Sequence, residues 1–164
     1  MREKPYNVLF VCTGNSARSI LAEALLNDAG KGSFHAWSAG SHPTGTVNSL
    51  ALDVLTEMHV SAGTPRSKNW EEFAEPGAPQ MDFIFTVCDS AAGEACPYWP
   101  GKPATAHWAV PDPAAAQGTE EERRQGFRDA AATLRRRIDL MLSLPTGTLD
   151  GLHAQGHLRD IGSR

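Results

Sequence analysis

The chain has 164 residues, a net charge of −4 and a pI of about 5.8, which suits one domain with its own core. This balance excludes the basic surface typical of proteins that bind nucleic acids or membranes, and no apolar run reaches membrane-spanning length. Three cysteines, an odd number, and residues 1–5 without the apolar stretch of a signal peptide indicate reactive thiols in the cytoplasm.

Strand-like and helix-like segments alternate along the chain. In order we expect a strand at 6–11, a helix at 18–29, a strand at 34–38, helices at 48–58 and 69–73, strands at 81–87 and 105–110, and a long helix at 120–143. The alternation predicts an α/β fold, a three-layer sandwich in which helices cover both faces of a central, parallel, four-stranded sheet.

The last third of the chain holds the long helix and a tail. A basic run, Arg135, Arg136 and Arg137, falls on the long helix, where we expect a solvated face. We divide the chain into one domain at residues 1–144 and a C-terminal tail at 145–164 with a short helix at about 149–159.

The most specific motif joins the first strand to the first helix. Residues 11–19 read Val-Cys-Thr-Gly-Asn-Ser-Ala-Arg-Ser, which puts Cys12 and Arg18 six positions apart. Such a loop turns backbone N–H groups inward, and the helix start adds its own N–H groups and positive dipole end. We therefore predict an oxyanion loop, formed by Thr13, Gly14, Asn15, Ser16, Ala17 and Arg18.

The positive electrostatic field of the loop N–H groups and of the helix start should also stabilise a sulfur anion. Cys12 is therefore the expected nucleophile, with a pKa below that of a free thiol. The planar guanidinium of Arg18 matches two oxygens of a bound phosphate-like group, and the hydroxyl of Ser19 can donate to the thiolate.

Two further residues follow the ends of later strands. Cys88 ends the strand at 81–87, and Asp112 follows the strand at 105–110. Because ligands bind outside the carboxyl ends of parallel strands, Cys12, Cys88 and Asp112 should meet at one edge of the sheet. There Cys88 can attack an adduct of Cys12, and Cys96 can in turn attack Cys88. The alternatives are a core thiol for Cys88, a surface thiol for Cys96 and a turn for Asp112.

These motifs resemble the low-molecular-weight tyrosine phosphatase superfamily and, within it, the arsenate reductases. The resemblance covers residues 6–144 and rests on four segments: the loop at 12–19, Trp37-Ser38-Ala39-Gly40, residues 87–97, and His107-Trp108 through Asp112-Pro113. It implies the phosphatase I fold for a catalytic domain at 1–144, and reduction of arsenate to arsenite in arsenic detoxification.

The resemblance also implies roles for the residues. Cys12 attacks arsenic, Arg18 and Ser19 assist it, Asp112 protonates the leaving oxygen, and Cys88 and Cys96 form a redox-active relay. Phosphate and sulfate compete with arsenate. Thioredoxin, or glutathione with glutaredoxin, is the external reductant, and no bound cofactor or metal is expected.

The chain departs from these relatives in three ways. Seven residues separate Cys88 from Cys96, which leaves open whether Cys96 or an external thiol resolves the intermediate. Ala17 stands where several relatives carry a further cysteine. Asn15, Glu23 and Ser38 match positions that hold a potassium ion in some relatives, but the fourth, acidic position falls on Lys68. Its ammonium would supply the positive charge itself, which argues against a potassium site.

Two other functions remain as alternatives. A low-molecular-weight tyrosine phosphatase would need only Cys12, Arg18 and Asp112, but residues 114–116 are alanines where tyrosines typically contact a phosphotyrosine ring. A non-enzymatic sensor of arsenite or a metal would use the three thiols, and it leaves Arg18 unexplained. Zinc is disfavoured because the gap between Cys88 and Cys96 exceeds the usual ligand spacing.

Overall fold

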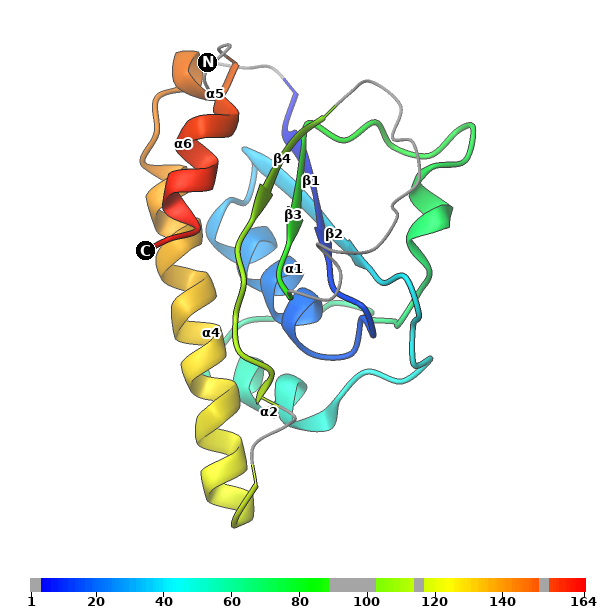
Figure 1. Ribbon diagram of the computed structural model, residues 1–164, viewed down its shortest axis with the longest axis vertical. Helices are drawn as coiled ribbons and strands as arrows, with labels where there is room; N and C mark the ends of the chain where they lie inside the picture. Colours follow the sequence, from blue (N-terminus) through cyan, green and yellow to red (C-terminus); the bar gives the residue numbers. More distant parts are fainter. Residues whose placement is uncertain (1–3, 89–102, 114–116, 151–153) are drawn as a thin grey trace.

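The computed structural model describes residues 4–88, 103–113, 117–150 and 154–164 (Figure 1). Its elements, in chain order, are β1 (Tyr6–Val11), α1 (Arg18–Ala29), β2 (Phe34–Ala39), α2 (Ser49–Glu57), the 3-10 helix η1 (Trp70–Phe73), β3 (Phe83–Thr86), β4 (Ala104–His107), α4 (Glu120–Leu142), α5 (Thr146–Asp150) and α6 (Ala154–Ile161).

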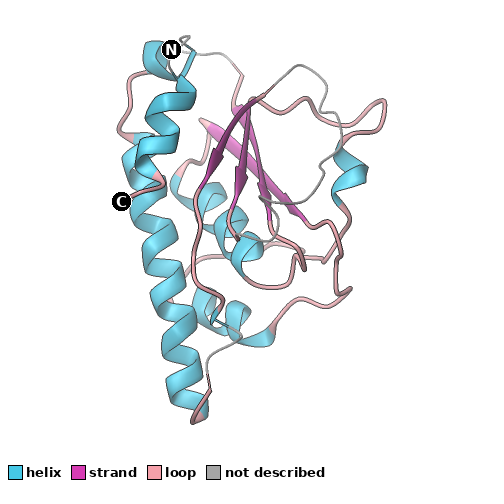
Figure 2. Ribbon diagram, viewed as in Figure 1, coloured by secondary structure: helices cyan, strands magenta, loops and turns pink. Residues whose placement is uncertain are grey.

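The four strands form one parallel sheet in the order β2-β1-β3-β4 (Figure 2). The central strand β1 is buried at every residue except the partly exposed Asn7, and its residues 8–11 are all apolar, as expected for a strand covered on both faces. Helices α1 and α4 pack against each other on one side of the sheet. On the other side η1 lies beside β2, where the rings of Phe73 and Trp37 are 6.5 Å apart. The expected α/β fold with a parallel four-stranded sheet is confirmed.

The last two strands differ from the prediction at their ends. β3 and β4 span 83–86 and 104–107, against the expected 81–87 and 105–110. Beyond β4 the chain still follows β3, since the amide of Trp108 donates to Thr86 at 2.7 Å and the amide of Val110 to Val87 at 3.1 Å. The apolar residues past His107 thus reflect burial and not a regular strand.

The C-terminal tail is part of the same core. It contains two helices, α5 and α6, where the sequence predicted one at 149–159. Leu158 of α6 is fully buried, and its carbonyl accepts a hydrogen bond of 2.8 Å from the indole of Trp108. Figure 1 shows α6 beside β4 and α4. The tail therefore covers the β4 edge of the sheet.

Candidate active site

The oxyanion loop lies between the end of β1 and the start of α1. Its outward carbonyls are taken by a neighbouring segment: His42 donates its amide to Thr13 at 2.9 Å and Thr44 donates to Gly14 at 3.0 Å. The side chain of Ser67 also donates to the Gly14 carbonyl. With its carbonyls held outside, the loop can present N–H groups on its inner side.

Asn15 supports the loop from behind. It is fully buried and has a left-handed φ of 44°, a conformation that Asn tolerates better than most residues. Its side-chain amide donates to Ser19 Oγ at 2.8 Å, and its Oδ1 accepts the Lys68 amide at 2.8 Å. The hydroxyl of Ser19 thus accepts from Asn15. No hydrogen bond from Ser19 to Cys12 occurs among those of the described residues.

Gly40, directly after β2, lets two chain segments meet. A Cβ atom there would lie 2.4 Å from the Thr13 carbonyl oxygen and 2.6 Å from that of Cys12. Gly40 also donates to Lys68 at 2.9 Å and accepts from Trp70 at 2.9 Å. Only glycine fits this approach, so residue 40 sets the distance between the loop and the end of β2.

The first turn of α1 differs from those of α2 and α4. Asn48 and Thr119 cap α2 and α4 with their side chains, whereas Ala17 at the start of α1 offers no side-chain cap. The N–H groups of this turn and the positive dipole end are therefore left for an anion in the loop.

Cys88 lies against the oxyanion loop. The Thr13 amide donates to Cys88 Sγ at 3.3 Å, and the Thr13 hydroxyl lies 3.7 Å from the same sulfur. Cys12 and Cys88 are both buried. The sheet topology has thus brought together two cysteines that are far apart in the sequence, at the edge where an oxyanion would bind.

The expectation of a lowered pKa for Cys12 is wrong for this arrangement. A hydrogen bond with the Cys88 thiol, together with burial, raises the pKa of Cys12 above the ordinary thiol value. The charge of Arg18 and the Gly14 amide oppose this rise. The sequence argument placed Cys88 near Cys12 as a later attacking thiol, but it did not include a hydrogen bond between the two thiols when it predicted the pKa of Cys12.

Arg18 links the loop to the segment that carries Asp112. Its Nη1 donates to the Val110 carbonyl at 2.9 Å, and its Nη2 lies 4.0 Å from Asp112 Oδ2. The Asp112 side chain is 46% exposed and so can contact a ligand. Cys12, Cys88 and Asp112 do meet at one edge of the sheet. Cys96 and residues 114–116 lie outside the described residues.

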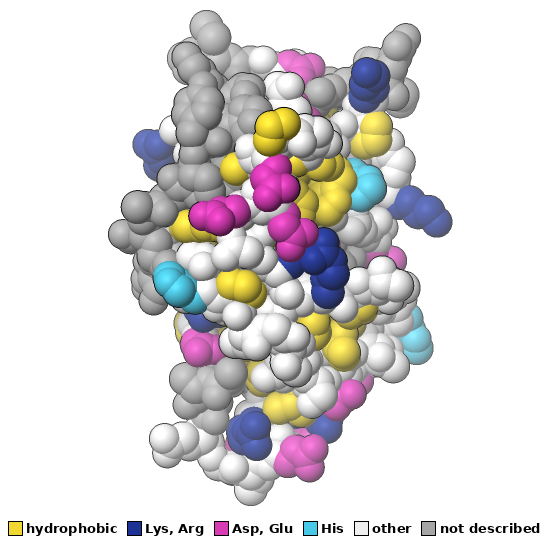
Figure 3. All heavy atoms as spheres, turned by 90° about the vertical axis from the view of Figure 1, so that its right-hand side faces the viewer, with side chains coloured by type: hydrophobic (Ala, Val, Ile, Leu, Met, Phe, Trp, Pro, Cys, Tyr) yellow, Lys and Arg dark blue, Asp and Glu magenta, His cyan; other side chains and the backbone are white. Residues whose placement is uncertain are grey.

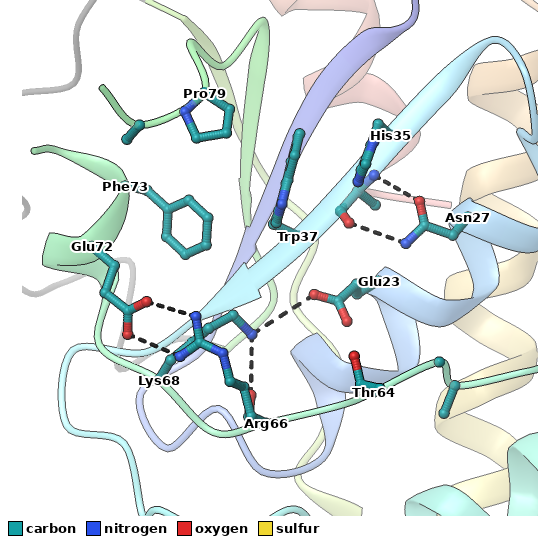
Figure 4. Close-up of a pocket in the computed structure, with 14 residues that line it drawn as sticks. Glu23, Asn27, His35, Trp37, Thr64, Arg66, Lys68, Glu72, Phe73 and Pro79 are labelled. Carbon is teal, nitrogen blue, oxygen red and sulfur yellow. Dashed lines mark hydrogen bonds and ion pairs between the residues drawn. The ribbon is translucent and has the colours of Figure 1, made fainter. Parts of the chain in front are cut away.

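A buried ion pair lies behind the loop (Figure 4). Lys68 Nζ is 3.8 Å from Glu23 Oε1 and donates to the Arg66 carbonyl at 3.0 Å. Ser38 Oγ donates to the same Glu23 oxygen at 3.2 Å. Burial raises the pKa of Glu23 and lowers that of Lys68, and the attraction between the two charges opposes both shifts. The ammonium of Lys68 supplies positive charge next to Glu23, as the sequence predicted.

The ion pair borders a pocket of about 430 Å³ at the β2 edge. Its walls include Trp37 and Phe73, and Arg66 forms a bidentate pair with Glu72 at its rim. Figure 3 shows this face, where basic and acidic side chains lie side by side next to apolar ones. Sequence reasoning missed the role of Arg66 here, since nothing in its spacing singles it out.

The prediction that Arg137 lies on a solvated helix face was wrong. The sequence placed it with Arg135 and Arg136 on a solvated helix face, but only 7% of Arg137 is exposed. The available signal was its spacing from Leu134 and Met141, which puts it on the apolar stripe of α4.

No helix in the described part of the chain is both long enough and apolar enough to span a membrane.

Comparison with known proteins identifies the family of this chain. Residues 7–148 match the family model described as low molecular weight phosphotyrosine protein phosphatase, and the chain belongs to this family. A protein named arsenate reductase from Halalkalibacterium halodurans is 32% identical over 131 residues, which cover 80% of this chain and 91% of the relative.

Two solved structures are similar. A low molecular weight protein tyrosine phosphatase from T. tengcongensis has a TM-score of 0.68 and 26% identity, covering 85% of this chain and 99% of its own. A thioredoxin-dependent arsenate reductase from Corynebacterium glutamicum has a TM-score of 0.56 and 25% identity, covering 85% and 65%. The chain is thus similar to structures of both kinds.

Proposed function

We propose that this protein is an arsenate reductase that works through a cysteine relay. The observation that carries the proposal is the position of Cys88, whose sulfur accepts a hydrogen bond from the amide of Thr13 and contacts Cys12. A phosphatase needs one thiol in this place, whereas a reductase needs a second thiol within reach of the first. The naming of the relatives supports the same choice.

The chemistry begins in the oxyanion loop. The Cys12 thiolate attacks arsenic, and Asp112 protonates the departing oxygen, which leaves as water. Arg18 and the loop N–H groups hold the remaining oxygens. Arg18 also lies beside Asp112, so it can orient the acid while it binds the anion.

The second step reduces arsenic. The Cys88 thiolate attacks the sulfur of Cys12, a Cys12–Cys88 disulfide forms, and the arsenic–sulfur bond breaks. The electron pair of that bond stays on arsenic, which leaves as arsenite. In the third step Cys96 or an external thiol attacks Cys88, and thioredoxin or glutathione with glutaredoxin returns the protein to its reduced state.

The test is arsenate turnover coupled to NADPH oxidation, run in parallel with thioredoxin and with glutathione plus glutaredoxin. Cys88→Ser should abolish repeated arsenate turnover but keep slow hydrolysis of p-nitrophenyl phosphate, because ester hydrolysis needs no second thiol. Cys96→Ser should accumulate a Cys12–Cys88 disulfide if Cys96 resolves it. Normal arsenate turnover by Cys88→Ser, or hydrolysis without any arsenate turnover in the wild type, would favour the phosphatase.

A further inference from the structure

Two arginines hold the backbone directly before Asp112. The Ala109 carbonyl accepts a hydrogen bond of 2.8 Å from Arg137 Nη1, and the Val110 carbonyl accepts one of 2.9 Å from Arg18 Nη1. Arg18 belongs to the oxyanion loop, but Arg137 comes from the C-terminal part of α4. Residues 108–112 are called the acid segment below.

The burial of Arg137 lowers the stability of the folded state. It lies among the apolar residues of α4, it is only 7% exposed, and its Nε has no hydrogen-bond partner among the residues described. No described carboxylate forms an ion pair with it, and burial, followed by the charge of Arg136, lowers its pKa. A buried guanidinium without an anion destabilises a fold, and an apolar side chain would fill the same volume without that cost. What Arg137 contributes is its hydrogen bond to the Ala109 carbonyl.

The acid segment transmits its position to Asp112. Pro111 and Pro113 flank Asp112. Their rings fix the φ angles of residues 111 and 113, directly before and after the acid. A displacement at Ala109 is therefore less easily absorbed within the segment than it would be without the prolines. Arg18 contacts both Val110 and Asp112, so the same displacement also changes the contact between the acid and the oxyanion loop.

We propose that Arg137 is a positioning residue that fixes the Ala109 carbonyl and thereby aligns Asp112 with the oxyanion loop. The inference rests on the proposed function insofar as Asp112 acts there as an acid on the leaving oxygen. Arg137 touches no reacting atom, so its effect should appear only in steps that need the proton from Asp112.

Two aryl esters separate this effect from a general loss of structure. Phenolate leaves slowly unless it is protonated, whereas p-nitrophenolate needs much less help. In Arg137→Met we expect kcat/KM, which reports the steps up to departure of the phenol, to fall about tenfold for phenyl phosphate, as for a weakened general acid, and less than about threefold for p-nitrophenyl phosphate. Arg137→Lys, which keeps a donor, should recover most of the loss. Arg136→Met is the matched control, since Arg136 is exposed and also donates to a backbone carbonyl, that of Arg164 at 2.8 Å.

Equal falls for the two esters in Arg137→Met, or the same pattern in Arg136→Met, would mean that Arg137 only stabilises the fold. Amide hydrogen exchange on the full chain gives a readout that is independent of any reaction. The Val110 amide should exchange faster in Arg137→Met, while the amides of β3 keep their wild-type rates. If the wild type neither hydrolyses the esters nor reduces arsenate, the proposed function fails, and unchanged exchange at Val110 would overturn the positioning role by itself.

Discussion

Replacing Gly40 by alanine should distort the oxyanion loop. The new Cβ would lie 2.4 Å from the Thr13 oxygen, 2.6 Å from the Cys12 oxygen and 3.0 Å from the Asn15 nitrogen, and all three are backbone atoms. Even a contact of 3.0 Å requires the loop or residue 40 to move by about 0.6 Å, and a relaxed contact requires about 1 Å. Because hydrogen bonds to Lys68 and Trp70 hold Gly40 on its other side, at least part of this displacement falls on the loop.

The expected losses of stability and of turnover follow from this displacement. Overpacking of this kind costs about 1–3 kcal/mol of unfolding free energy. In a protein of this size each kcal/mol lowers Tm by about 2–4 °C. Misplacing a nucleophile by about 1 Å lowers turnover by about 10²-fold. Gly40→Ala should therefore lose arsenate turnover far more than it loses stability.

The assay combines arsenate turnover, protection of Cys12 from iodoacetamide by phosphate, and thermal unfolding. Gly156→Ala is the control, because residue 156 lies within α6 with no other atom within 4 Å of the added Cβ. There alanine should stabilise the protein by about 0.5–1 kcal/mol and leave turnover unchanged. Wild-type turnover and phosphate protection in Gly40→Ala would refute the claim that this close approach shapes the loop.

Two further predictions concern charge. In Cys88→Ala the largest cause of the raised Cys12 pKa is gone, so the midpoint of its alkylation rate against pH should fall, and an unchanged profile would show that Cys88 does not control Cys12. Lys68→Met leaves the buried carboxylate of Glu23 unpaired, which should cost about 3 kcal/mol near neutral pH. Because the pKa of Glu23 is already raised and should rise further, the folded state keeps its proton longer than the unfolded state does. Stability is then lost as the pH rises from the unfolded pKa of Glu23 through the folded one. Urea unfolding of Lys68→Met should accordingly show a smaller deficit at pH 5 than at pH 7, and a deficit equal at both would contradict the pairing.

Much of the candidate site could be predicted from local sequence, and the rest depends on tertiary contacts. The spacing of Cys12 and Arg18 between a strand and a helix start was enough to predict the loop, and strand topology was enough to bring Asp112 to it. The topology also predicted that Cys88 lies near Cys12, but the pKa of Cys12 could not be predicted, because it depends on a hydrogen bond between the two thiols and on their burial. The composition of the basic run did not separate Arg137 from Arg135 and Arg136, but its spacing from Leu134 and Met141 on α4 did.

The hydrogen bond from the Thr13 amide to Cys88 has a consequence for substrate affinity. Cys88 Sγ already accepts from this amide, so an oxyanion that enters the loop competes with the sulfur for the same donor. Apparent affinity is then the intrinsic affinity reduced by the fraction of molecules in which the sulfur has moved aside. In the proposed reductase the two arrangements have separate roles: with the Thr13 amide released the loop is ready for the anion, and with Cys88 against Thr13 the two thiols are close enough for the disulfide step.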